Sequence, residues 1–192
     1  MSAQPSASAS RRREAILDAA LELFRQRGYH SVGIDEIGTR AGISGPGVYR
    51  HFANKAALLV ALFDSITERM LQAAEEIEKI EGPPDEILDR LVGYHVATAV
   101  RERGLLAVWI HDWRSLPPAD SQRLRHRQVE YLSIWSGALS ALRPDLGPAE
   151  AETVVHAALG AVNSVALADT GLPPEDVELI LARAARAILA KT

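Results

Sequence analysis

The stretch AGISGPGVYRHFANK, residues 41–55, places Gly45, Pro46 and Gly47 in succession within a segment that is otherwise typical of a helix. Glycine and proline weaken a helix interior, but they are tolerated in the first turn, where the amide groups have no acceptor inside the helix. Ser44 stands directly before them, and serine caps helix starts through its hydroxyl. The stretch therefore predicts a short helix that begins after Ser44.

A second short helix comes before this one, and the two are expected to form a helix-turn-helix pair. The spacing predicts a helix over residues 34–41, and Gly42 supplies the turn. Ile37, Ile43 and Val48 then have the spacing by which two short helices bury the faces where they meet. The first turn of the second helix is left with little side-chain bulk and can approach a phosphate or a base edge closely.

Side chains outside this packing are candidates for contact with nucleic acid. With Val48 and Phe52 facing inward, the neighbouring Tyr49, Arg50 and His51 face solvent or a ligand. Tyrosine and histidine can donate to phosphate oxygens, and arginine can also reach the edge of guanine. Basic residues on either side extend the candidate surface: Lys55 at the next helix start, and Arg11, Arg12 and Arg13 at the start of the first helix. The three arginines also fit a plain solvated face.

The charge distribution favours a small N-terminal contact surface. The 192-residue chain has a net charge of −4, which by itself argues against a nucleic-acid binder. Residues 1–60, however, hold eight Lys or Arg against five Asp or Glu, a net charge of +3, whereas residues 61–192 hold thirteen against twenty, a net charge of −7. The chain contains no cysteine, which excludes disulfides and thiolate metal sites.

Helical spacing recurs along the whole chain, which predicts an all-α fold. Residues 1–10 are expected to be a flexible tail, residues 11–60 a helix-turn-helix domain, and residues 61–192 a second helical domain. Loop signals predict a long helix over about 55–80 and five more over about 85–103, 105–115, 120–142, 149–169 and 174–190. No apolar run is long enough to span a bilayer, so no membrane partner and a cytoplasmic location are expected.

The N-terminal pattern resembles a known family. It comprises Gly28-Tyr29, Ile34 with Ile37, Ala41-Gly42-Ile43-Ser44, Val48-Tyr49 with Phe52, and Lys55 with Leu58 and Leu59. Over about residues 12–63 this pattern resembles the DNA-binding domain of the TetR family of transcriptional regulators. The resemblance implies a three-helix DNA-binding domain, a helical ligand-binding domain, and a homodimer through the last two helices, about 149–169 and 174–190.

Carried over by position, the same resemblance assigns DNA contact to seven residues: Ser44, Gly45, Gly47, Tyr49, Arg50, His51 and Lys55. Gly45 departs from the family pattern, because lysine often occupies that position. The expected function is a regulator, most simply a repressor, that binds a double-stranded DNA operator as a dimer and is released by a small-molecule effector. No cofactor and no metal are expected.

Large amphipathic side chains in the second domain are candidates for an effector pocket, since Trp and Tyr combine an apolar wall with a polar group. The candidates are Tyr94, Trp109, Trp113, Tyr131, Trp135 and Asn163. Aromatic residues at such positions are also common core residues. An apolar lining together with the nearby Arg123, Arg125 and Arg127 favours a hydrophobic effector with an acidic or phosphate-bearing end, such as an acyl thioester.

Two other function classes compete with a regulator. An enzyme is suggested superficially by His111 next to Asp112, but adjacent helical residues diverge by about 100°, so they do not form a ready pair. A helical protein-interaction module without DNA binding is the second alternative. Steep loss of affinity with salt would separate DNA binding from it.

Overall fold

The computed structural model describes residues 7–190 and is all α-helical over that range, with no strand. The elements in chain order are α1 Ala7–Arg27, α2 Ile34–Arg40, α3 Gly45–Tyr49, α4 Lys55–Glu78, α5 Pro84–Arg101, α6 Arg103–Asp112, the 3-10 turn η1 Trp113–Ser115, α7 Pro118–Leu142, α8 Pro148–Asn163, the 3-10 turn η2 Ser164–Ala166, and α9 Pro174–Leu189. The all-α prediction is confirmed. Helix α1 starts four residues inside the expected tail, so residues 7–10 are helical, and residues 1–6 lie outside the described range.

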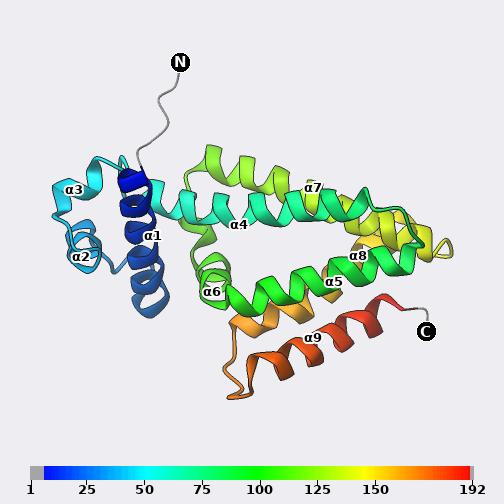
Figure 1. Ribbon diagram of the computed structural model, residues 1–192. Helices are drawn as coiled ribbons and strands as arrows, with labels where there is room; N and C mark the ends of the chain where they lie inside the picture. Colours follow the sequence, from blue (N-terminus) through cyan, green and yellow to red (C-terminus); the bar gives the residue numbers. More distant parts are fainter. Residues whose placement is uncertain (1–6, 191–192) are drawn as a thin grey trace.

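Helices α1 to α3 form a small lobe at one end of the molecule, and α4 runs from this lobe along the larger one (Figure 1). The small lobe is built around apolar side chains that are fully shielded from solvent, among them Ile16 and Phe24 of α1 and Ile37 of α2. Val48 is completely buried and Phe52 nearly so, as the sequence predicts. The helix-turn-helix pair is therefore held from behind by α1 and α4.

The core of the small lobe does not stop at the expected domain seam near residue 60. The same cluster continues through Phe63 of α4 to Leu105 and Val108 of α6 and to Leu124 of α7, all of them buried. A separate core, centred on Trp135 and Leu139 of α7, joins α5, α7, α8 and α9. The two lobes are consequently packed against each other through apolar contacts and are not joined by a flexible linker.

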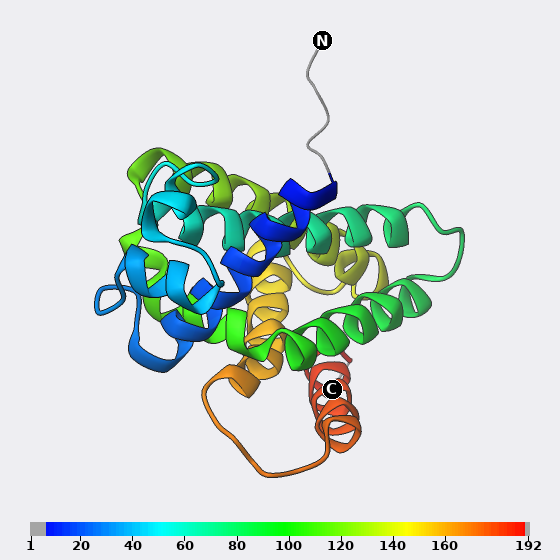
Figure 2. The ribbon, with the colours of Figure 1, turned by 60° about the vertical axis from the view of Figure 1, so that its left-hand side comes forward.

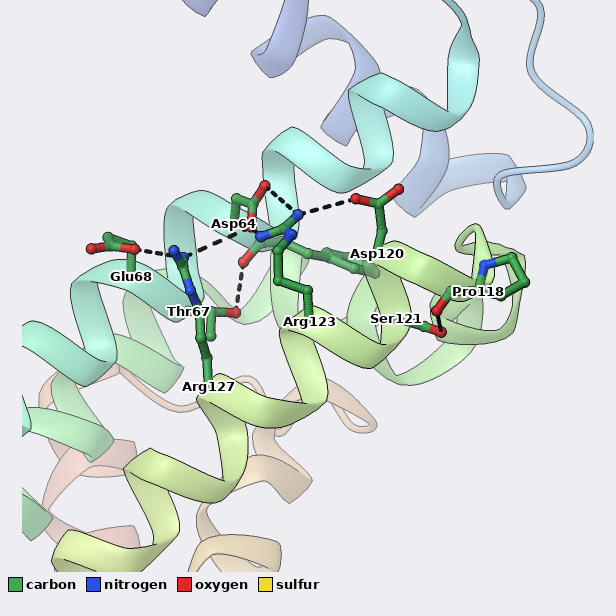
Figure 3. A network of polar contacts seen from close by, with 9 residues as sticks. Asp64, Thr67, Glu68, Pro118, Asp120, Ser121, Arg123 and Arg127 are labelled. Atoms are coloured by element: carbon green, nitrogen blue, oxygen red, sulfur yellow. Dashed lines mark hydrogen bonds and ion pairs between the residues drawn. The ribbon is translucent and has the colours of Figure 1, made fainter.

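Ion pairs connect α4 to α7 alongside these apolar contacts (Figure 3). Arg123 binds the carboxylate of Asp64 with both terminal nitrogens and also contacts Asp120, at 3.2 Å. Arg127 pairs with Glu68 at 2.5 Å. Arg123 and Arg127, two of the arginines that the sequence suggests for an acidic end of an effector, are thus paired with acids of the protein while their side chains remain partly exposed.

Helix α9 lies on the outside of the larger lobe, packed on α8 and α5 (Figure 2). Large apolar side chains are exposed on α9 and on the segment before it: Leu167, Leu172, Leu179 and Ile180. Beside them α8 exposes small residues, including Ala157 and Gly160. Within residues 7–190, no helix has the length and apolar character that a bilayer crossing requires.

Candidate functional site

The start of α3 has the geometry that the opening stretch predicts. The Ser44 hydroxyl oxygen accepts a hydrogen bond from the Gly47 amide at 3.3 Å, and Pro46 lies in the first turn. Val48 anchors the helix from below, while Tyr49 is 55% exposed and Arg50 is exposed next to it. His51 is half-buried at the end of the helix. The outward face of α3 is thus a short, low-bulk helix start followed by polar donors.

Gly45, one of the expected DNA contacts, is buried at the start of α3. A Cβ atom at this position would lie 1.7 Å from Oδ1 of Asp35, on the preceding helix. Gly38 makes a similarly close approach, since its Cβ would lie 3.1 Å from the Gly45 amide nitrogen. The Asp35 carboxylate is the end of a flexible side chain and can rotate away from position 45, whereas a Cβ on Gly38 would meet backbone atoms. The close crossing of α2 and α3 therefore depends on glycine at position 38.

Lys55 also has a role other than the expected phosphate contact. Its ammonium donates to the carbonyl oxygens of Tyr29 at 2.8 Å, Val32 at 2.9 Å and His30 at 3.4 Å. It also lies 4.4 Å from the centre of the Tyr29 ring. An ammonium has three donors, and these three carbonyls take them all. Lys55 therefore ties the start of α4 to the loop between α1 and α2.

Arg11, Arg12 and Arg13 lie inside α1, not at its start, and all three are exposed. Successive helical residues point about 100° apart, so the three guanidinium groups cannot share one face. Arg13 is placed by contact: its guanidinium carbon lies 4.8 Å above the ring of Phe52. Arg13 and His51 border one surface groove beside the end of α3, which brings one arginine of the three to the candidate DNA face.

The larger lobe contains a cavity of about 140 Å³ among α4, α5, α6, α7 and α8. Its walls are Ile66, Thr67, Met70, His95, Thr98, Ala99, Glu102, Leu105, Leu106, Trp109, Gln128, Tyr131, Leu132, Leu159 and Asn163. Of the six side chains expected in an effector pocket, three line this cavity: Trp109, Tyr131 and Asn163.

The other three expected side chains point elsewhere. The hydroxyl of Tyr94 donates to the Arg69 carbonyl on α4 at 3.3 Å. Trp113 packs on Trp109, with ring centres 4.5 Å apart, in the core that joins the lobes. Trp135 is 1% exposed and belongs to the second core. Trp135 thus has the common structural role of a buried aromatic residue, while Tyr94 and Trp113 are partly exposed.

His95 is the centre of a polar network at the cavity wall. Its Nε2 lies 3.0 Å from Oδ1 of Asn163, and its Nδ1 lies 2.9 Å from the hydroxyl of Tyr131. A carboxamide oxygen only accepts, so Nε2 donates to Asn163 and Nδ1 accepts from Tyr131. Burial lowers the pKa of His95 to about 4, against a smaller opposing effect of its bond to Asn163, and burial raises the pKa of Tyr131. The imidazole is therefore neutral at neutral pH.

Sequence reasoning missed His95 and Thr98 as cavity residues. A signal was present, because His95, Thr98 and Glu102 recur at helical spacing along the otherwise apolar inner face of α5 and the residue that caps its end. Thr98 is 3% exposed, and its hydroxyl has no hydrogen-bond partner within residues 7–190. A buried hydroxyl without a partner is unfavourable and needs an explanation.

A chain of contacts leads from the cavity wall to the small lobe. Trp109 lines the cavity and packs on Phe63 of α4, with ring centres 4.7 Å apart, and on Trp113. Two residues after Trp113, the hydroxyl of Ser115 is 3.0 Å from Nε2 of His30, in the loop that Lys55 also holds. A change at Trp109 is thus two contacts away from the loop between α1 and α2.

Comparison with known proteins matches both lobes. The family profile for bacterial regulatory proteins of the tetR family covers residues 16–62, and a profile for the tetracyclin repressor-like C-terminal domain covers residues 81–167. Among similar proteins, the HTH-type transcriptional activator FasR of Mycolicibacterium smegmatis is 40% identical over 65 residues, which cover 34% of this chain and 30% of that protein.

The fatty acid metabolism regulator protein of Bacillus subtilis is 26% identical over 125 residues, 65% of this chain and 64% of that protein. The chain therefore matches less than two thirds of the length of either relative. A crystal structure of FadR from Bacillus subtilis, solved in complex with stearoyl-CoA, shares the fold, with a TM-score of 0.74 at 21% identity over 92% of this chain and 97% of that one. With the helix-turn-helix lobe and the C-terminal lobe both matched, the chain belongs to the TetR family of bacterial regulatory proteins.

Proposed function

We propose that this protein is a ligand-responsive transcriptional regulator that binds an operator as a dimer and represses by occupying it. The observation that carries the proposal is the tip of α3, where a serine-capped, glycine-containing start is followed by exposed Tyr49 and Arg50 over a buried Val48. Such a start brings free amide groups and side-chain donors to a duplex together. The protein would act on chromosomal DNA in the cytoplasm.

The proposed DNA contacts are a subset of those expected from the sequence. Arg50 is assigned to a base edge or phosphate, and further contacts come from Ser44, Gly47, Tyr49, His51, Arg11, Arg12 and Arg13. Gly45 is not assigned a contact because it is buried against Asp35. Lys55 is not assigned one because its ammonium is bound to carbonyl groups.

The proposed dimer forms through α8 and α9. Exposed Leu179 and Ile180 on α9 lie next to the small-residue face of α8, and an apolar face of this kind suits packing against a second copy. The dimer would place two copies of α3 in successive major grooves, about 34 Å apart for half-sites one helical turn apart.

The proposed effector is a small, largely hydrophobic molecule that enters the cavity. An acyl thioester is the leading class, because a protein of the same fold was solved with stearoyl-CoA. The present cavity, about 140 Å³, is smaller than the ~300 Å³ at which drug-sized pockets begin, so such an effector must enlarge it. Enlargement would move Trp109, which contacts Phe63 of α4, and this is the proposed route by which binding reaches the small lobe. The role is that of a binding protein and involves no catalysis.

Fluorescence anisotropy with labelled DNA from upstream of the gene tests the proposal. We expect tight, dimer-dependent binding that weakens steeply between 50 and 200 mM salt, and release by acyl-CoA. Arg50→Ala should remove most of the affinity. Arg90→Ala, at an exposed arginine on α5 far from α3, is the matched control and should bind normally. An affinity for DNA that changes neither with salt nor in Arg50→Ala would favour the alternative, a helical protein-interaction module.

A further inference from the structure

Two polar side chains of the cavity wall, Thr98 and Asn163, are neutral and can donate a hydrogen bond to a ligand. Thr98 contributes a hydroxyl that is buried and unpartnered within the described chain. Asn163 uses its amide oxygen to accept from His95, which leaves its NH₂ group available to a ligand. Both residues line the cavity, Thr98 from α5 and Asn163 from the end of α8.

No lysine or arginine is among the described residues that line the cavity. The one acid there, Glu102, is held by Arg69 at 3.1 Å and by Arg101 at 3.5 Å. The imidazole of His95 is neutral, and both of its nitrogens are already engaged by Tyr131 and Asn163. A carboxylate would therefore enter a largely apolar site whose lining offers no cation to compensate its lost hydration, since Arg69 and Arg101 are already paired with Glu102.

We infer that the cavity selects an uncharged ligand whose oxygen accepts a hydrogen bond from Thr98, as an alcohol, ester, ketone or thioester does, and discriminates against the free carboxylate of the same chain length. This inference rests on the proposed function in taking the cavity as the effector site. It explains the unpartnered hydroxyl: Thr98 is satisfied when the ligand is bound. The same selectivity would let the cavity distinguish a thioester, whose carbonyl is neutral, from the ionised fatty acid that hydrolysis of the thioester releases.

A matched pair of probes tests the selectivity. 1-Octanol and octanoate differ in charge at nearly the same size, and calorimetric titration at pH 7.5 measures the affinity of the full chain for each. We expect 1-octanol to bind at least about tenfold more tightly, because the ionised carboxylate loses its hydration without gaining a cation. Octanoate binding as tightly as 1-octanol, or no binding of 1-octanol up to its solubility limit, would overturn the inference.

Two variants test the role of Thr98. Thr98→Val keeps the shape but removes the hydroxyl, and it should weaken 1-octanol about fivefold while leaving octanoate unchanged. Thr98→Ser keeps the hydroxyl and should bind 1-octanol within about twofold of the unmodified protein, which separates a lost hydrogen bond from altered packing. Unchanged 1-octanol affinity in Thr98→Val contradicts the assignment.

Operator binding, measured on the same samples, distinguishes the two proposals. If 1-octanol binds selectively but the protein does not bind its upstream DNA, or binds the DNA and is not released by acyl-CoA, the regulatory function fails and the selectivity stands. If the protein binds DNA and responds to acyl-CoA but shows no preference between the two probes, the selectivity fails and the regulatory function stands.

Discussion

Replacing Lys55 by methionine tests whether its ammonium contacts DNA phosphate or instead acts as an internal clamp, that is, holds the loop between α1 and α2 to the start of α4. Methionine retains the apolar length of the side chain but removes the ammonium. The clamp bonds to Tyr29 and Val32 are 2.8 and 2.9 Å long. Hydrogen bonds to a charged group stabilise by about 1.5–3 kcal/mol each, so the lower limit for these two gives a loss of about 3 kcal/mol on substitution. For a chain of this size, that loss corresponds to a melting temperature lower by about 6–12 °C.

Thermal unfolding and the salt dependence of operator binding together test this reasoning. We expect Lys55→Met to melt early but to keep the slope of log affinity against log salt, measured at a temperature where the variant is folded. Arg50→Ala is the opposite control, with an unchanged melting temperature and a shallower slope. If Lys55→Met instead melted normally and its slope fell by about 0.9 for each lysine lost, the residue would contact phosphate and the clamp would be unimportant.

Three further predictions follow from contacts described above. Burial lowers the pKa of His95 from 6.5 to about 4, so the unfolded state binds more protons between these pH values. The free energy of unfolding should therefore fall by up to about 3 kcal/mol as pH falls from 6.5 towards 4. Urea unfolding at pH 7.5 and 4.5 should show this loss, and His95→Gln should remove this contribution to the pH dependence. Gly38→Val places a Cβ atom 3.1 Å from the Ile43 carbonyl oxygen and from the Gly45 nitrogen. This overpacking should lower the free energy of unfolding by about 2 kcal/mol, measured by thermal unfolding. A melting temperature equal to that of the parent would show that the turn between α2 and α3 moves to make room. Asp64→Asn breaks partly exposed ion pairs and should cost less than about 1 kcal/mol in 50 mM salt and nothing measurable in 1 M salt; a loss that persists in 1 M salt would refute the surface role.

Local chemistry explains what the sequence predicts well. The start of α3 depends on Ser44 and Pro46, and its anchoring depends on Val48, all within five residues of one another. Most helix ends marked by proline and glycine are likewise predicted to within three residues, except the end of the helix expected over 149–169, which stops at Asn163 and continues only as the 3-10 turn to Ala166. Such features depend on short-range geometry, which a sequence carries directly.

The structure departs from the sequence-based expectations where contacts between distant residues decide the surroundings of a side chain. Gly45 looks like an open helix start, but its packing against Asp35 depends on the crossing of α2 and α3. Lys55 looks like a phosphate ligand, but the carbonyls that bind it come from a loop more than twenty residues earlier. In the cavity, aromatic character identified Trp109 and Tyr131, whereas the direction of each helix face decided that His95 lines the cavity and Tyr94 does not.

Helix α4 is an uninterrupted rod of 24 residues that belongs to both lobes. Its first half contributes to the core behind α3, and Ile66, Thr67 and Met70, from the middle of the helix, form part of the cavity wall. At 1.5 Å per residue the rod is about 36 Å long, so a tilt of about 5° around one end displaces the other by about 3 Å. In a symmetric pair each rod would swing in its own half, and the spacing of the two copies of α3 would change by up to about 6 Å, a mismatch of nearly two base-pair steps of a duplex at about 3.4 Å each.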